Sequence, residues 1–140
     1  MPYLLDTNAV SETAKPRPHA GLMNFLSSVP LNDTYLSAIT AGEIEYGVER
    51  ATDPARRLQL RAWADRLLDQ DYRGRVLPID RGVMTSWARI VLSSGKTPGQ
   101  LPKMDTLLAA TALHHGLTLV TRNTADFEAL GVPFLNPWES

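Results

Sequence analysis

The fold is decided first by residues 3–8, which read YLLDTN. Three apolar residues stop abruptly at Asp6, as they do where a short buried strand of a parallel sheet ends. Asp6, Thr7 and Asn8 therefore follow the carboxyl end of a strand, where α/β proteins commonly place their binding and catalytic groups. We expect residues 3–5 to form a buried strand that delivers these polar side chains to a site.

Further short apolar runs alternate with helical patterns along the rest of the chain. We expect strands at residues 34–37, 76–79, 117–121 and 133–135. We expect helices at residues 10–14, 22–29, 37–51, 54–72, 81–94 and 102–115, and a short one near residue 127. This alternation predicts an α/β fold, a three-layer sandwich whose central, mainly parallel sheet has helices on both faces.

Two of these helices carry specific packing predictions. The helix over residues 102–115 is apolar nearly all round, so it should be deeply buried, and Gly116 should close it as a C-cap. At the start of the helix after residue 37, Ser37 is a candidate N-cap. The pattern over residues 54–72 predicts an inward face made of the following side chains: Leu58, Ala62, Trp63 and Leu68.

Length and composition indicate one globular unit. The chain has 140 residues, 44% of them hydrophobic and 21% charged, and we expect residues 1–140 to form a single domain. It contains no cysteine, which excludes disulfides, zinc–thiolate sites and thiol nucleophiles. Its apolar runs are far shorter than the ~20 residues that a membrane helix needs, so we expect a soluble, cytoplasmic protein.

The charge balance gives little support for a nucleic-acid partner. The net charge is −1, whereas most nucleic-acid-binding proteins are basic. Residues 50–75 do hold seven arginines against four aspartates, a local surplus of 7 − 4 = +3. Charge patterns of this kind more often mark a solvated helix face than a binding patch, and we expect that here.

Four acids stand at the ends of predicted elements, namely Asp6, Glu43, Asp105 and Asp126. In a parallel sheet the strand carboxyl ends and the following helix N-termini share one edge, so these acids can converge there. Converging carboxylates repel one another unless they are protonated or hold cations, and Mg²⁺ prefers a few carboxylates plus water. The prediction is a magnesium site that hydrolyses phosphodiesters.

Each acid has a simpler explanation when it is taken alone. Asp6 could cap the first helix, Asp105 lies where the helix dipole favours an acid, and the other two could be surface residues. Helical spacing adds polar neighbours, because Ser37, Thr40 and Glu43 are three residues apart and share one helix face.

Four blocks of sequence together resemble a known family. They are residues 4–8 (LLDTN), 36–44 (LSAITAGEI) with Gly47, 105–112 (DTLLAATA) and 120–127 (VTRNTADF). In this order and at this separation they resemble the motif blocks of PIN-domain VapC-type toxins, and they are most similar to the FitB-like branch. The resemblance covers nearly the whole chain and implies a metal-dependent endoribonuclease, the toxin of a toxin–antitoxin pair.

The resemblance also implies roles for individual residues. Asp6, Glu43 and Asp105 match the first three catalytic and metal-binding acids of the family. The fourth can stand at the position of Asn123 or of Asp126, and because Asn123 is an amide we assign it to Asp126. Residues expected around the acids or against the substrate are Thr7, Asn8, Ser37, Thr40, Thr121, Arg122 and Asn123.

The cofactor and partners follow from the same resemblance. We expect Mg²⁺, with Mn²⁺ as a second option, an RNA substrate, and a cognate antitoxin whose basic C-terminal segment lies across the acidic cleft. An arginine there could bridge two carboxylates and inhibit the enzyme. Such a complex would bind operator DNA through the antitoxin. We also expect a homodimer, in which Trp63, Leu67 and Trp87 add apolar surface.

Three other interpretations compete with this one. A haloacid-dehalogenase-like phosphatase needs a second Asp two positions after the first, and that position is Asn8. A non-catalytic PIN-fold module that binds RNA or a partner would have no use for all four acids. A housekeeping RNA-processing nuclease would be expected to carry an accessory domain.

Overall fold

Five short strands, all parallel, form the centre of the computed structural model, which describes residues 2–139. The strands are β1 (Tyr3–Leu5), β2 (Thr34–Ser37), β3 (Val76–Leu77), β4 (Thr118–Val120) and β5 (Phe134–Leu135). Their order in the sheet is β3-β2-β1-β4-β5, and each neighbouring pair is parallel. The structure therefore confirms the parallel sheet and places residues 3–5 at its middle.

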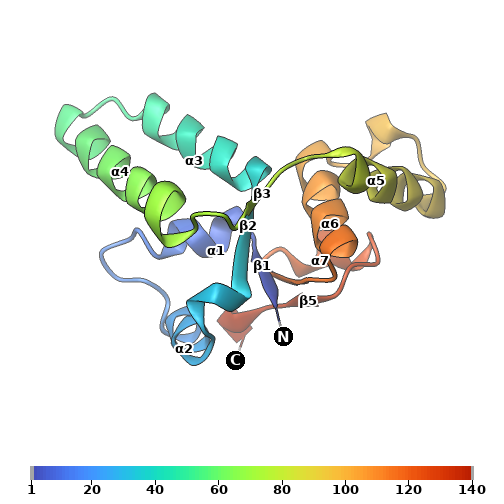
Figure 1. The fold of residues 1–140 in the computed structure, drawn as a ribbon, viewed down its shortest axis with the longest axis horizontal. Coiled ribbons are helices and arrows are strands. Elements are labelled where there is room, and N and C mark those ends of the chain that lie inside the picture. The colour runs from blue at the N-terminus through green and yellow to red at the C-terminus, as the bar shows by residue number, and fades with distance from the viewer. Residues whose placement is uncertain (1, 140) are drawn as a thin grey trace.

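Helices cover both faces of this sheet (Figure 1). The α-helices are α1 (Thr7–Glu12), α2 (Ala20–Ser28), α3 (Ala38–Arg50), α4 (Pro54–Arg66), α5 (Arg81–Ser94), α6 (Lys103–His115) and α7 (Thr124–Glu128). Short 3₁₀ turns lie at Leu31–Asp33, Pro98–Gln100 and Pro137–Glu139, and one π turn, Leu67–Asp71, extends α4. Within residues 2–139, no helix has the length and apolar character needed to cross a bilayer.

The side chains of the central strands alternate between two hydrophobic clusters, as the two-residue period of a strand requires. Leu4 and Leu119 belong to the cluster that packs under α5 and α6. Leu5 and Val120 point the other way, into the cluster formed with α1, α2, α3 and the base of α4. The three-layer sandwich predicted from the sequence is thus confirmed, with one core on each face of the sheet.

Local signals fixed most helix ends as expected. Gly116 adopts a left-handed conformation, with φ of +66°, and ends α6. Most of the buried residues of α6 lie along its apolar run, as predicted. Several boundaries differ from the expectations, such as the start of α2 at Ala20 and the end of β3 at Leu77, and α1 begins at Thr7 rather than at residue 10. Asp6 caps that helix and starts it directly after β1.

The inward face predicted for α4 is partly wrong. Leu58 is 73% exposed and Ala62 is also exposed, whereas Trp63 and Leu68 are half-buried and pack against the core. The face of α4 that meets the core carries Leu60 and Ala64 instead, followed by Leu67 in the π turn. Leu58 and Ala62 lie on the neighbouring face of the helix, which is turned to solvent.

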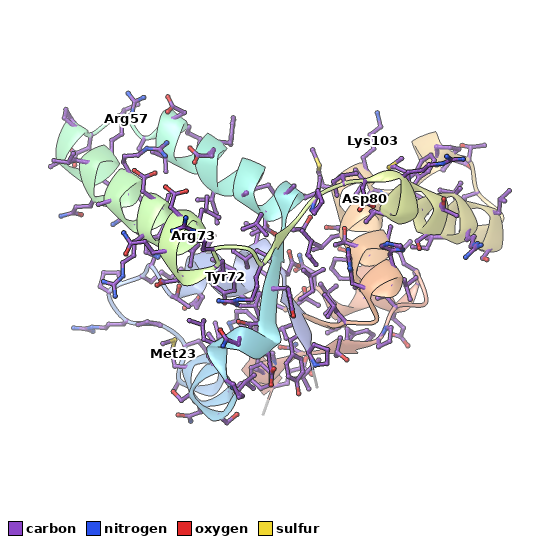
Figure 2. All side chains as sticks on the ribbon, viewed as in Figure 1. Met23, Arg57, Tyr72, Arg73, Asp80 and Lys103 are labelled. Atoms are coloured by element: carbon purple, nitrogen blue, oxygen red, sulfur yellow. The ribbon has the colours of Figure 1, made fainter. Side chains whose placement is uncertain are left out.

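Polar contacts hold together the arm that α3 and α4 form, which extends away from the sheet (Figure 1). In Figure 2, Arg57 lies at the outer end of the arm and Tyr72 at its base. The Tyr72 hydroxyl is 2.9 Å from the Thr34 hydroxyl in the sheet. Arginines of α4 pair with glutamates of α3, as in the ion pair of 2.6 Å between Arg61 and Glu45. These pairs support the solvated helix face expected for the basic stretch.

The residues proposed for a dimer surface lie mostly in the core. Leu67 is buried in the cluster beneath α3 and α4. Trp63 packs against that same cluster and Trp87 against the one beneath α5 and α6, each being half-buried. Leu67 therefore does not supply the apolar surface that was expected of it, whereas Trp63 and Trp87 keep part of their surface exposed.

Candidate active site

Asp6 is held rigidly at the carboxyl end of the central strand. Its Oδ1 accepts a hydrogen bond of 2.6 Å from the backbone N–H of Thr7. Its Oδ2 accepts from the Thr121 hydroxyl at 2.7 Å and from the Asn8 amide at 3.2 Å. Burial raises the pKa of Asp6, which is only 6% exposed, and the charge of Glu43 adds to the effect while the hydrogen bonds oppose it.

Glu43 stands on the exposed side of α3 and is tied to the first helix. The Thr7 hydroxyl donates to its Oε1 at 2.7 Å. The same hydroxyl is 3.1 Å from that of Thr40, which is fully buried one turn before Glu43. A hydroxyl carries one proton, so with Thr7 donating to Glu43 the Thr40 hydroxyl donates to Thr7. This chain of contacts fixes Glu43 relative to Asp6.

Asp105 and Asp126, the third and fourth predicted acids, lie near enough to the first two for their charges to interact. Asp105 lies half-buried in the first turn of α6, and Asp126 lies in the first turn of α7. The pKa of Asp105 is raised, first by burial and then by the charges of Asp6, Asp126 and Glu43. The four acids predicted from the sequence therefore act on one another across three helices and a strand end.

Thr121 links the acids to the loop after β4. Besides donating to Asp6, its hydroxyl accepts a hydrogen bond of 3.0 Å from the backbone N–H of Asn123. Asn8 spans the same gap, because its side-chain oxygen lies 3.4 Å from the backbone N–H of Arg122, which donates to it. Asn123 is the N-cap residue of α7 and is exposed. Thr121 and Asn8 thus hold the acid-bearing ends of β1 and β4 in register.

Two of the predicted site residues have other contacts. The Ser37 hydroxyl accepts from the backbone N–H of Ile39 at 3.0 Å, so it serves as the N-cap of α3. The guanidinium of Arg122 lies 5.6 Å from the ring centroid of Trp138, a cation–π contact. No sequence pattern indicated that contact, because the partner lies sixteen residues further on in a short 3₁₀ turn.

The donor set fits a cation that keeps much of its water. In residues 2–139, no group of three or more His, Asp or Glu side chains lies close enough to hold a metal by itself. A closed protein cage of the zinc type is therefore not what the described residues build. Mg²⁺ instead binds through one or two carboxylates together with waters and substrate phosphates. The mutual repulsion recorded at Asp105 is the feature that such a cation would relieve.

A family model described as the PIN domain matches residues 3–132. This span runs from β1 to beyond α7 and includes all four acids. The chain belongs to the PIN-domain family. Within that family it is similar to Toxin FitB of Neisseria gonorrhoeae, with 38% identity over 136 residues that cover 96% of this chain and 97% of the relative.

Two further comparisons agree with this placement in the PIN-domain family. The VapC ribonuclease Y4jK of Sinorhizobium fredii is 35% identical over 137 residues, which cover 97% of each protein. The solved structure of FitAB bound to an IR36 DNA fragment matches with a TM-score of 0.86 and 35% identity, over 97% of this chain and 95% of that one. The family suggested by the four sequence blocks is confirmed.

Proposed function

We propose that this PIN domain is a metal-dependent endoribonuclease that hydrolyses RNA phosphodiester bonds, with Asp6, Glu43, Asp105 and Asp126 as its catalytic and metal-binding acids. The observation that carries the proposal is the convergence of the four acids from the end of β1 and the helices α3, α6 and α7, close enough that the charges of the other three help burial to raise the pKa of Asp105. Acids arranged to repel one another at a sheet edge are costly unless a cation binds between them.

We assign Mg²⁺ as the working metal, with Mn²⁺ as an alternative, and Asp6 and Asp105 as its principal ligands. Glu43 and Asp126 would complete the site through direct contacts or through water. A divalent cation bound there supplies Lewis-acid polarisation of the phosphate and makes a neighbouring water more acidic. Carboxylate oxygens are the donors that such a hard cation prefers.

The chain's own polar residues prepare these acids for binding. Thr121 and Asn8 donate to Asp6 Oδ2, which leaves its carboxylate in one orientation. Thr7 does the same for Glu43 Oε1. Outer groups of this kind orient metal ligands and tune their affinity. Arg122 and Asn123, which are exposed beside Asp126, are assigned to contacts with the RNA phosphates.

The toxin role rests on the relatives. One is named Toxin FitB, another is a VapC ribonuclease, and the FitAB complex binds DNA. We therefore infer that this chain is the toxin of a toxin–antitoxin pair. Its antitoxin would lay a basic C-terminal segment across the acidic cleft, and the complex would bind operator DNA through the antitoxin.

Three further parts of the proposal concern the domain organisation, the location in the cell and the oligomeric state. Residues 1–140 form one PIN domain, since both hydrophobic clusters are built on the same sheet. The enzyme acts in the cytoplasm, where its RNA substrate is found. The chain pairs as a homodimer, although through a surface other than Leu67. Light scattering that gave a mass near 15.4 kDa at micromolar concentration would contradict the dimer.

The direct test of the activity uses total RNA. We expect the purified chain to cut RNA at defined positions with Mg²⁺ or Mn²⁺ present and to stop when a chelator is added. Mapping the new ends at nucleotide resolution would identify the substrate. Binding of RNA without any cleavage under all metal conditions would instead indicate a non-catalytic PIN module.

A further inference from the structure

A groove of about 670 Å³ opens beside the acids and runs along α3. Thr7 and Glu43 line the end that it shares with the candidate active site. Its floor continues along one face of α3 through Gly42, Tyr46 and Arg50, which are spaced four positions apart. The groove is therefore a continuation of the acidic site rather than a separate hollow.

An aromatic ring and a cation lie together on this floor. Tyr46 is 67% exposed, although a ring of this size is usually largely buried. The guanidinium of Arg50 lies 5.7 Å from the Tyr46 ring centroid. Met104, which is 55% exposed on α6 next to Asp105, lines the same groove. Aromatic rings combined with arginine are the groups on which unpaired bases stack.

Glycine keeps part of the groove free of side chains. Gly42 and Gly47 lie in the interior of α3, where glycine is less favourable than alanine. A Cβ atom at either position would meet no heavy atom within 4 Å, and neither glycine has a positive φ. Packing and backbone conformation therefore do not require them. Both line the groove, so their effect is to leave room for an occupant.

We propose that this groove binds an unpaired nucleotide next to the scissile phosphate, with its base stacked on Tyr46 and its phosphate near Arg50. The proposal rests on the nuclease function proposed above and adds a base-binding position on α3, beside the acids. Tyr46 stands about one helical turn from Glu43, so its ring is within reach of the base next to a phosphate held at the acids.

The charges along the groove favour RNA over a protein segment. Glu43 lines the part of the groove nearest the acids, since its charge acts on Asp6 and Asp105, and a cation there would meet the scissile phosphate. Arg50 lines the groove two helical turns further on and suits the next phosphate. Between them lie the ring and the space over Gly42. A nucleotide strand matches this sequence of groups, because it repeats phosphate and base at each step.

The central experiment measures RNA affinity rather than cleavage. We would measure the Kd of an unstructured RNA of about 12 nucleotides by fluorescence anisotropy in the Asp105→Asn background with Mg²⁺. Tyr46→Ala should weaken binding by about tenfold or more, and Tyr46→Phe, which keeps the ring, should stay within about twofold. Leu92→Ala removes a similarly exposed side chain, on α5, and should bind as the parent does.

RNAs with a single abasic site then identify stacking as the cause. At one position in the RNA, removing the base should weaken binding to the parent protein, which has Tyr46, by the same factor as Tyr46→Ala weakens binding to intact RNA. The Tyr46→Ala variant should lose nothing further from that abasic site. Equal affinity of Tyr46→Ala and parent for intact RNA would overturn the proposal, as would losses that simply add at every abasic position.

Gly42→Leu provides a second variant that is expected to fold well. Leucine is a better helix former than glycine and has room here, so Tm should rise. Its side chain fills the groove, so RNA binding should weaken although the fold is more stable. Unchanged RNA affinity in this variant would contradict the proposal. A second outcome would also contradict it. If the Tyr46→Ala protein no longer bound a co-expressed antitoxin but kept its RNA affinity, the groove would be a binding site for protein rather than for RNA.

The nuclease proposal and the groove proposal can fail separately. If the Asp105→Asn background still cuts the RNA, the assigned acids are wrong, and the same affinity comparison is then made in chelator. If that background does not cut while Tyr46→Ala binds normally, the nuclease proposal stands and the groove proposal fails.

Discussion

Asp6 and Asp105 both have raised pKa values, but the causes differ. At Asp6 burial dominates and three hydrogen-bond donors oppose it. At Asp105 burial is joined by the charges of the three other acids. The charges of the three other acids all act on Asp105, so removing its charge should relieve part of the repulsion in the cluster.

We predict that Asp105→Asn stabilises the metal-free protein at neutral pH. A carboxyl whose folded-state pKa exceeds its unfolded value of about 3.9 lowers stability as the pH rises through that range. After allowance for its partial exposure, the gain should be on the order of 0.5–1 kcal/mol, or a few degrees in Tm. Thermal melts in chelator would measure it, and the difference should vanish below about pH 4. A lower Tm for the variant at neutral pH would contradict this account.

We predict that Thr121→Val lowers activity without unfolding the protein. Valine keeps the shape but removes the hydroxyl that donates to Asp6 and accepts from the backbone of Asn123. The expected loss is about 10- to 100-fold in metal affinity or in kcat/KM. Thr111→Val is the matched control, since Thr111 is equally buried but donates only to Leu107 within α6. Equal losses in the two variants would mean that Thr121 is merely structural.

The sequence allowed the proximity of the acids to be predicted and placed Thr7, Asn8 and Thr121 around them, but it did not show which contacts these neighbours make. Asp6 and Asp105 stand out because a charge placed beside an apolar strand or helix is costly without a partner. The double use of the Thr121 hydroxyl depends on how β4 lies against β1, and no local pattern encodes that. The stacking of Arg122 on Trp138 likewise depends on where the chain returns after β5.

At the scale of elements, α4 and α6 are helices of equal length with opposite environments. α6 has six buried residues and lies in the core, whereas Ala64 is the buried residue of α4. Besides the apolar contacts of its inward face, α4 is joined to α3 by ion pairs that water can replace, such as that between Arg61 and Glu45. The arm should therefore open at a lower free energy than the body of the protein.

We predict that backbone amides in the outer half of α4 exchange much faster than those in the middle of α6. Local opening is cheapest where few apolar contacts are lost. Hydrogen–deuterium exchange followed by mass spectrometry on the whole chain would compare peptides from the two helices. Equal protection of the two would show that the arm is part of the cooperative core.

Element types were predicted well where a local signal exists. Gly116 ends α6 and Ser37 begins α3, as their residue types indicated. The inward placement of Leu58 failed for a physical reason. Two neighbouring faces of this helix carry apolar residues, and periodicity alone did not separate the face of Leu58 and Ala62 from the face of Leu60 and Ala64 that meets the core.

At the scale of the whole molecule, the strand order could not be read from the sequence. Alternating strands and helices indicated a parallel sheet, but the order β3-β2-β1-β4-β5 depends on pairings between segments far apart in the chain. The convergence of the acids could still be expected, because the carboxyl ends of parallel strands share one edge whatever their order. The site was therefore more predictable than the topology that builds it.

We predict that an arginine of the antitoxin inhibits the enzyme by bridging the acids. A planar guanidinium can take the place of the metal cation by donating hydrogen bonds to two carboxylates. Replacing each arginine of the partner's C-terminal segment by alanine should abolish inhibition at one position. Inhibition should also weaken with millimolar Mg²⁺ and with salt. Inhibition that survived every replacement would mean that the partner blocks the enzyme by another route.

The central claim is that the clustered acids carry the cleavage, and the most direct measurement is the single-turnover rate on one mapped RNA at saturating Mg²⁺. We would compare the wild-type chain with Asp6→Asn and Asp105→Asn, which remove one charge each and nearly preserve shape. We expect both variants to remain folded and their single-turnover rate to fall by about a thousandfold or more. A folded Asp6→Asn or Asp105→Asn protein that cut the RNA at close to the wild-type rate would contradict it.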